Sequence, residues 1–155
     1  MIPPAPKPDE LTKLILLVQF SATWTMVGLI WFVQLVHYPL FLLAGPSEFK
    51  QYHQQHTGRT QWVVSPPMLA ELLSAAALFF FRPDLVPRWG VATGVLLLAV
   101  IWGSTALVQI PLHNRLANSL ERSVCRKLVS TNWLRTIAWS LRGLLTAWMA
   151  WKVIP

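Results

Sequence analysis

The side chains best suited to chemistry in this 155-residue chain are four histidines and one glutamate in an apolar setting. His37 and His113 each close a long apolar stretch, whereas His53 and His56 lie three residues apart in a polar segment. Imidazoles bind metals and act as general acids or bases near neutral pH. Glu71 is the only acidic residue inside an apolar stretch. We therefore take His37, Glu71 and His113 as candidate catalytic residues.

The same imidazoles are compatible with more than one kind of site. His37, His56 and His113 form a candidate ligand set for a single metal ion, with His53 as the alternative to His56 and Glu71 in support. A haem held between His37 and His113 would use the same residues, and so would metal-free acid–base chemistry. A carboxylate-bridged di-iron site is disfavoured, because it needs about four glutamates. The sequence leaves the cofactor open.

Further polar side chains recur at helical spacing near these residues. Gln34 precedes His37 by one turn, and Gln109 precedes His113 by one turn. Four more polar or aromatic residues follow one face of the last apolar stretch. The candidate substrate-binding residues are Gln34, Gln109, Asn132, Arg135, Trp139 and Arg142. The alternative is that these groups only join helices through hydrogen bonds.

Glu71 and Arg142 fall at depths where a charge is costly. Arg142 lies roughly 15 Å into its apolar stretch, from the rise of about 1.5 Å per helical residue. A charge at the centre of a bilayer costs roughly 2.5–3.5 kcal/mol even on insertion scales. We therefore expect Arg142 to point inward and to meet Glu71, a backbone carbonyl or the polar stripe from Asn132 to Trp139. A pair of Glu71 with Arg142 would be either part of a site or a structural ion pair.

The composition is that of an integral membrane protein. Hydrophobic residues make up 54% of the chain, charged residues only 12%, and the mean hydropathy is +0.47. Such a chain has too few polar groups to cover a soluble domain. A single Cys125 excludes an internal disulfide or a thiolate metal cage. The net charge of +7 is better explained by anionic lipid headgroups than by nucleic acid.

The apolar stretches predict an all-α fold in one membrane domain. Spans are expected over residues 14–37, 66–81, 89–112 and 132–153, within a domain over 14–153 that follows a Pro-rich arm over 1–13. Successive spans cross the membrane in opposite directions, which predicts an up-down-up-down four-helix bundle with a tight hairpin between the second and third spans. This arrangement places all four histidines at one membrane face, with most of the polar residues near them.

The two long connections carry patterns of their own. Residues 39–63 are expected to form a partly helical loop, and Leu116, Leu120, Val124 and Leu128 recur every four residues between the third and fourth spans. With basic residues between them, these leucines and valine predict an interfacial amphipathic helix. Seven Lys and Arg flank the spans on the histidine side and five on the other. The positive-inside rule then predicts a multi-pass protein of the cell membrane with both long loops in the cytoplasm.

Several strings of the sequence resemble a set of uncharacterised bacterial four-helix integral membrane proteins. They are Val33-Gln-Leu-Val-His37-Tyr-Pro39-Leu-Phe41, Tyr52 with His56, Pro66-Pro67-Met-Leu-Ala-Glu71, Gln109-Ile-Pro111-Leu-His113 and Asn132-Trp133-Leu-Arg135-Thr. More distantly, the chain is similar to anthrone-oxygenase-like membrane proteins, which have a His-Pro pair at the end of the first helix. Here Tyr38 separates His37 from Pro39. The resemblance implies oxygenase-like chemistry on an aromatic or quinone-like substrate.

Two functional hypotheses follow. The first is a small membrane-embedded enzyme, such as an oxidoreductase, which acts on a lipid-soluble compound at one leaflet. The second is a non-catalytic subunit or assembly factor of a larger membrane complex, whose polar stripe only joins helices. A transporter is disfavoured, because the polar groups gather near one face and no pair of broken helices marks a site at the midplane.

Overall fold

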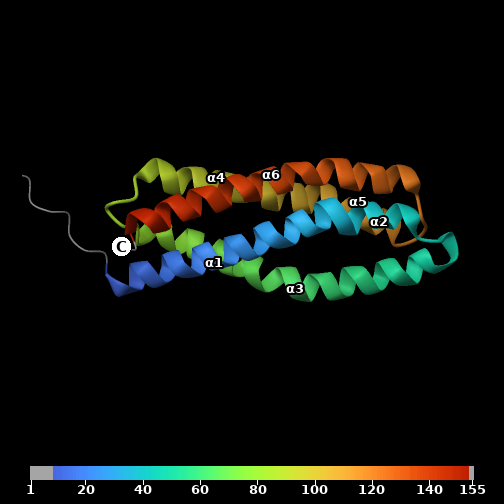
Figure 1. Cartoon of the computed structure of the whole chain (residues 1–155), viewed down its shortest axis with the longest axis horizontal. Helices are drawn as coiled ribbons and strands as arrows, with labels where there is room; N and C mark the ends of the chain where they lie inside the picture. The colour runs from blue at the N-terminus through green and yellow to red at the C-terminus, as the bar shows by residue number, and fades with distance from the viewer. Residues whose placement is uncertain (1–8, 154–155) are drawn as a thin grey trace, which may run out of the picture.

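The computed structural model describes residues 9–153, which form only helices and their connections. Four long helical stretches lie side by side, and each runs opposite to the one before it (Figure 1). Their main helices are α1 (Glu10–Phe32), α3 (Pro46–Phe80), α4 (Arg88–Ser104) and α6 (Arg122–Val153). The prediction of an all-α fold is confirmed for the described part of the chain.

The first helix begins earlier than the span predicted from residue 14. The Asp9 carboxylate accepts a hydrogen bond of 2.7 Å from the backbone N–H of Thr12, which caps α1. Hydrogen bonding by the side chain and the backbone of Thr12 keeps the pKa of Asp9 below its ordinary value. Residues 10–13 of the predicted arm are therefore helical, while residues 1–8 lie outside the described residues. Acidic groups at a helix start also complement the helix dipole.

Two π-helical turns interrupt the first and third helical stretches at equivalent places. After α1 come η1 (Val33–His37), α2 (Tyr38–Leu40) and η2 (Phe41–Leu43), and after α4 come η3 (Thr105–Gln109) and α5 (Ile110–Leu116). In both stretches a proline, Pro39 or Pro111, follows the π turn by two residues. A proline clashes with the carbonyl four residues before it, and a wider turn relieves that clash.

The predicted loop over 39–63 and the predicted start of the second span at residue 66 are wrong. Helix α3 is continuous from Pro46 to Phe80 and passes through Pro66 and Pro67. Its first part stays helical because it buries Phe49 and His53 in the bundle. The two prolines remove two backbone hydrogen bonds, and α3 changes direction along its middle (Figure 1).

The predicted interfacial helix between the third and fourth spans is also wrong. Residues up to Leu116 continue the third stretch, and α6 starts at Arg122 after a short turn. Leu116, Val124 and Leu128 are buried with Tyr38 and Phe41 in one hydrophobic cluster. The four-residue repeat therefore marks a face that packs inside the protein, because α2 and α3 cover it.

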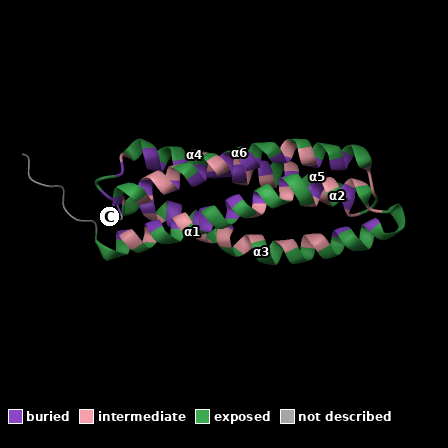
Figure 2. Cartoon of the chain, viewed as in Figure 1, coloured by how far each residue is buried: buried purple, intermediate pink, exposed green. Residues whose placement is uncertain are grey.

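Within residues 9–153, three helical segments are long and apolar enough to cross a membrane: Glu10–Leu43, Pro46–Phe80 and Arg88–Leu116. Their outward faces are largely exposed and their inward faces are buried (Figure 2). One hydrophobic cluster, with Phe41 and Leu128, lies at the end that holds the histidines. A second, with Ile30 and Trp139, includes residues of α1, α3, α4 and α6. These clusters fix the helices that present the polar residues described next.

Candidate functional site

All four histidines gather at one end of the bundle, which we call the histidine end. His37 Nε2 lies 2.6 Å from His56 Nδ1, and His53 Nε2 lies 3.0 Å from His113 Nδ1. The hydroxyl of Tyr38 lies 3.0 Å from His113 Nε2. Two hydrogen-bonded pairs of imidazoles therefore form across helices that are far apart in the sequence, and one of the pairs continues to a tyrosine.

The Phe41 ring lies among these four imidazoles. Its centroid is 5.1–5.8 Å from the rings of His37, His53 and His56, and 6.4 Å from that of His113. Phe41 is fully buried. Its edge-on contacts hold the rings in place through packing. Sequence reasoning did not find this residue, because an apolar residue at a helix end carries no signal of its own.

The predicted metal ligands His37, His56 and His113 do not form a ligand set in this arrangement. Among the described residues, no group of three or more His, Cys, Asp or Glu side chains is placed to hold a metal ion. The nitrogens of His37 and His56 are 2.6 Å apart, at direct hydrogen-bonding distance. Two histidine nitrogens on one tetrahedral zinc ion would be roughly 3.3 Å apart, from bonds of about 2.0–2.1 Å. The observed geometry suits proton sharing better.

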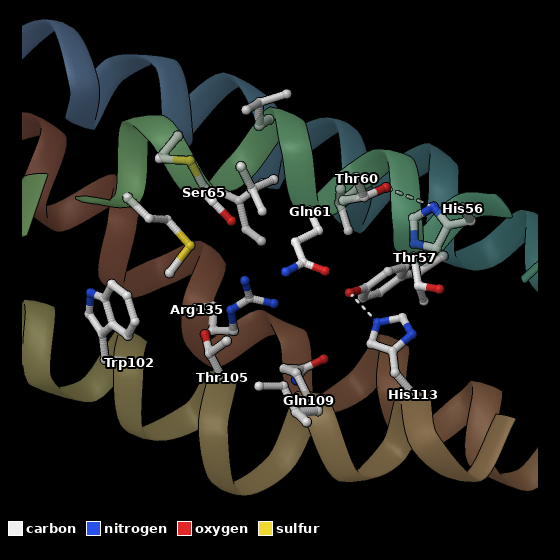
Figure 3. Close-up of a pocket in the computed structure, with 18 of the residues that line it drawn as sticks. His56, Thr57, Thr60, Gln61, Ser65, Trp102, Thr105, Gln109, His113 and Arg135 are labelled. Carbon is white, nitrogen blue, oxygen red and sulfur yellow. Dashed lines mark hydrogen bonds between the residues drawn. The ribbon is translucent and has the colours of Figure 1, made fainter. Parts of the chain in front are cut away.

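A cavity of about 520 Å³ opens beside the histidine pairs and is lined by α1, α3, α6 and the third helical stretch. Trp102 lies toward one end of this pocket and His56 and His113 toward the other, with Arg135 between them (Figure 3). The rest of its wall combines two sets of residues. The apolar ones are Met26, Leu29, Ile30, Val33, Val64, Met68, Leu69 and Ile110, and the polar ones include Thr57, Thr60, Gln61, Ser65, Thr105, Gln109 and Asn114. Most of the surface of the pocket is thus apolar, with imidazoles at one end and the guanidinium of Arg135 along its length.

The bend of α3 is next to this pocket. Ser65, Met68 and Leu69, which flank Pro66 and Pro67, all line it. Because the prolines break the regular backbone hydrogen bonding at this level, the first part of α3 need not pack closely against the third helical stretch. The Pro-Pro pair, which the sequence placed at a helix start, instead sits at the wall of the cavity.

Arg135 is held in position by a chain of amide side chains. Its Nη1 donates to Asn132 Oδ1 at 3.1 Å, and Asn132 Nδ2 donates to Gln34 Oε1 at 3.0 Å. The guanidinium also lies over the Trp139 ring, 5.1 Å from its centroid. Gln34, Asn132 and Trp139 therefore orient Arg135, while Arg135 and Gln109 themselves line the pocket. Of the other predicted substrate-binding residues, Gln34, Asn132 and Trp139 thus act through Arg135, and Gln109 lines the pocket with it.

Glu71 belongs to a different cluster from the one predicted. Its carboxylate accepts hydrogen bonds from Arg142 Nε at 2.9 Å, Thr23 Oγ1 at 2.6 Å and Trp139 Nε1 at 2.9 Å. Arg142 also donates to the carbonyl of Gly94. The predicted contact between Glu71 and Arg142 is confirmed, and both side chains are fully or almost fully buried.

The expectation that Glu71 shares one cavity with His37 and His113 is corrected by this geometry. Of the three, only His113 lines the pocket. His37 is hydrogen-bonded to His56, and Glu71 accepts hydrogen bonds from Thr23, Trp139 and Arg142. The reason is that Arg142 lies deeper than the histidines and draws the carboxylate toward itself. Tyr38 and Thr60, which sequence reasoning did not single out, do contact the imidazoles.

No family model, curated protein or solved structure matches this chain.

Proposed function

We propose that this chain is a four-span integral membrane protein that binds a lipid-soluble aromatic or quinone-like compound at one leaflet and exchanges protons with it. The observation that carries this proposal is the pocket of about 520 Å³, whose apolar body meets Tyr38, His56, His113 and Arg135 at its polar part. Small-molecule sites combine mostly apolar walls with a few polar groups in this way.

The arrangement of α6 supports a fourth span. Its polar residues Asn132, Thr136 and Arg142 are buried against the other helices. Its first turns expose basic and polar residues, but from Trp133 to Trp151 every exposed position is apolar: Trp133, Leu134, Ile137, Leu141, Leu144 and Trp151. A helix with this division has a low overall hydropathy and still presents an apolar surface to lipid. Polar residues within membrane spans characteristically face the interior of the bundle.

The hydrogen bonds around His113 support proton exchange. Tyr38 and His113 both line the pocket, and the second nitrogen of His113 is bonded to His53. A neutral imidazole carries one donor and one acceptor nitrogen, so it takes up a proton on one side as it releases another on the other. The row Tyr38–His113–His53 can thus hold or pass a proton at the edge of the pocket.

An oxidoreductase is the enzyme class that this arrangement would serve most directly. Reduction of a quinone, or oxidation of a phenol, moves protons together with electrons, and the imidazoles beside the pocket would handle the protons. The resemblance to anthrone-oxygenase-like membrane proteins is in keeping with an aromatic compound of this kind. We propose His113 and Tyr38 as the groups that contact the compound, with His53 acting through His113.

The excess of basic residues favours the cytoplasmic side for the histidine end. Lys50, Arg59, Arg115, Arg122, Arg126 and Lys127 lie at that end of the chain's helices, while Arg135 is turned into the interior. By the positive-inside rule we place this end in the cytoplasm and the protein in the cell membrane.

Titration calorimetry of the purified protein in a non-ionic detergent tests the proposal. The probe is a short-chain naphthoquinol, measured in two buffers that differ in their heat of ionisation, so that proton exchange on binding is obtained separately. The wild-type protein is expected to bind the probe and to exchange protons with the buffer as it does so. The His113→Gln variant is expected to bind the probe with less proton exchange. Ser65→Phe, which fills the pocket, is expected to lose binding, whereas Ala99→Phe on the exposed face of α4 keeps it.

Two results would contradict the proposal. One is the absence of saturable binding to wild type, and the other is equal binding by Ser65→Phe and Ala99→Phe. If, in addition, substitution of each of the four histidines changed only the yield of folded protein, slightly and alike, the structural-subunit hypothesis would account for the protein better.

A further inference from the structure

Arg135 is a buried cation that lines the pocket without an anionic partner among residues 9–153. Arg135 is only 8% exposed, and its Nε has no hydrogen-bond partner within the described part of the chain. A buried charge is costly unless it is paired and fully hydrogen-bonded. Its contact with the Trp139 ring and the nearby hydroxyl of Tyr38 offset part of this cost, and the bond to Asn132 uses one of five N–H donors. A neutral tyrosine does not balance the charge of the guanidinium.

No acidic side chain is available to neutralise Arg135. All six acidic residues of the chain lie within the described range, and none of them forms an ion pair with it there. Glu71 pairs with Arg142, Glu10 with Lys13 and Glu121 with Arg115. Asp9 caps α1, and the two others, Glu48 and Asp84, are exposed. Arg142, the other buried arginine, differs from Arg135 because its charge is paired with Glu71.

The position of the guanidinium points to a ligand as the missing partner. Figure 3 shows Arg135 reaching into the middle of the pocket toward Gln61 of the facing helix. Gln109, which also lines the pocket, leaves its own Oε1 without a partner among the described residues. Arg135 is held from behind by Asn132, so its orientation does not depend on the ligand.

We propose that the natural ligand of this pocket carries one anionic oxygen group, a carboxylate or a phenolate, on an apolar body, and that Arg135 binds this group. The inference rests on the proposed function and narrows its ligand class. Guanidinium groups bind such oxygens through strong, charge-assisted hydrogen bonds. The apolar body would extend along the wall toward Trp102, while the anionic group would lie within reach of Arg135 and the Tyr38–His113 pair.

Matched pairs of probes test this assignment. Thermal unfolding of the wild-type protein, followed by tryptophan fluorescence in a non-ionic detergent, is measured with dodecanoate and with its methyl ester. An alkylated nitrophenol and its methyl ether form the second pair. At about pH 8.5 the carboxyl and nitrophenol groups are both ionised, whereas their capped forms are neutral. A ligand that binds the folded state raises the unfolding temperature according to its affinity.

The expected result is that at least one anion stabilises wild type more than its capped partner. Arg135→Gln should weaken binding of that anion by roughly tenfold to a hundredfold, the range for a hydrogen bond to a charged group, and leave the capped probe unchanged. Arg126→Gln, which removes an exposed arginine of the same helix, should leave both unchanged. Which pair shows the preference distinguishes a carboxylate from a phenolate.

Failure of this inference is distinguishable from failure of the proposed function. Suppose that the anions and their capped forms stabilise wild type equally and that Ser65→Phe abolishes the effect of both. The pocket would then be a binding site, as proposed, but its ligand would not need to be anionic. If no probe stabilises wild type, both the proposed function and the anionic ligand are contradicted. Should Arg135→Gln not fold, the wild-type comparison still decides, and Arg135→Lys is expected to keep part of the preference because it retains the charge.

Discussion

A double-mutant cycle on Glu71 and Arg142 tests the claim that a charge inside this bundle must be paired. Both side chains are 2% exposed or less, and their closest atoms are 2.9 Å apart. Glu71→Leu removes the acceptor of Arg142, Thr23 and Trp139 together. Because this leaves a buried cation without its partner, we expect it to lower the free energy of unfolding by about 3–5 kcal/mol.

The double substitution is expected to cost less than the sum of the single ones. Arg142→Leu alone strands the Glu71 carboxylate, although Thr23 and Trp139 still donate to it, so we expect a loss of about 3 kcal/mol. With both charges gone, the remaining cost is that of two orphaned donors, about 1–3 kcal/mol each. From the middle of each range, the coupling between the two sites should be about 3 kcal/mol.

Unfolding of the purified protein by sodium dodecyl sulfate, followed by circular dichroism, provides the free energies. The matched control is a cycle on Glu48 and Arg126, an acid and a base that are both exposed, for which the effects should add. If Glu71→Leu and Arg142→Leu were additive within about 0.5 kcal/mol, the usual limit for independent sites, the pairing of the two charges would not be what stabilises them.

Three further predictions concern packing, the bend of α3 and orientation. A Cβ added at Gly143 would lie 3.0 Å from a methyl group of α1, whereas one at Gly28 meets nothing within 4 Å. Gly28→Ala should therefore raise the unfolding temperature through a gain in helix propensity of about 1 kcal/mol, and Gly143→Ala should raise it less or lower it. Equal shifts of the unfolding temperature would contradict this order. Pro67→Ala should straighten α3, raise thermal stability and weaken binding of the naphthoquinol probe; unchanged calorimetric affinity would separate the bend from the pocket. A cysteine at Ser119 should be protected from impermeant maleimide in intact cells and one at Asp84 labelled, and the opposite pattern would reverse the orientation.

The helices and their pairing were largely predictable, because apolar length and the rise per residue fix where the residues of a span lie. Counting along the helix was enough to name Glu71 among the possible partners of Arg142, and to place the four histidines at one end. The prediction that was wrong concerns the start of the second span. Pro66 and Pro67 are typical of a helix start, yet tertiary packing of Phe49 keeps the preceding residues helical.

The pocket could not be predicted from the sequence for a related reason. Its existence depends on how far the first part of α3 departs from the third helical stretch, which no residue pattern specifies. Glu71 and His113 are both polar residues near the same leaflet. Spacing alone cannot tell that Glu71 is bonded to Thr23, Trp139 and Arg142 while His113 faces the cavity. Phe41 was missed because its role comes from its neighbours.

Photo-crosslinking with a lipid-soluble diazirine probe decides whether the cavity beside His113 is a ligand site. Mass spectrometry of the labelled protein in native-like membranes would map the modified residues. We expect labelling of pocket residues on α3 and the third helical stretch, such as Met68 and Trp102, which excess unlabelled probe removes and Ser65→Phe prevents. Labelling spread over outward residues such as Phe79 and Leu107, and insensitive to competitor, would show that the cavity binds no such ligand.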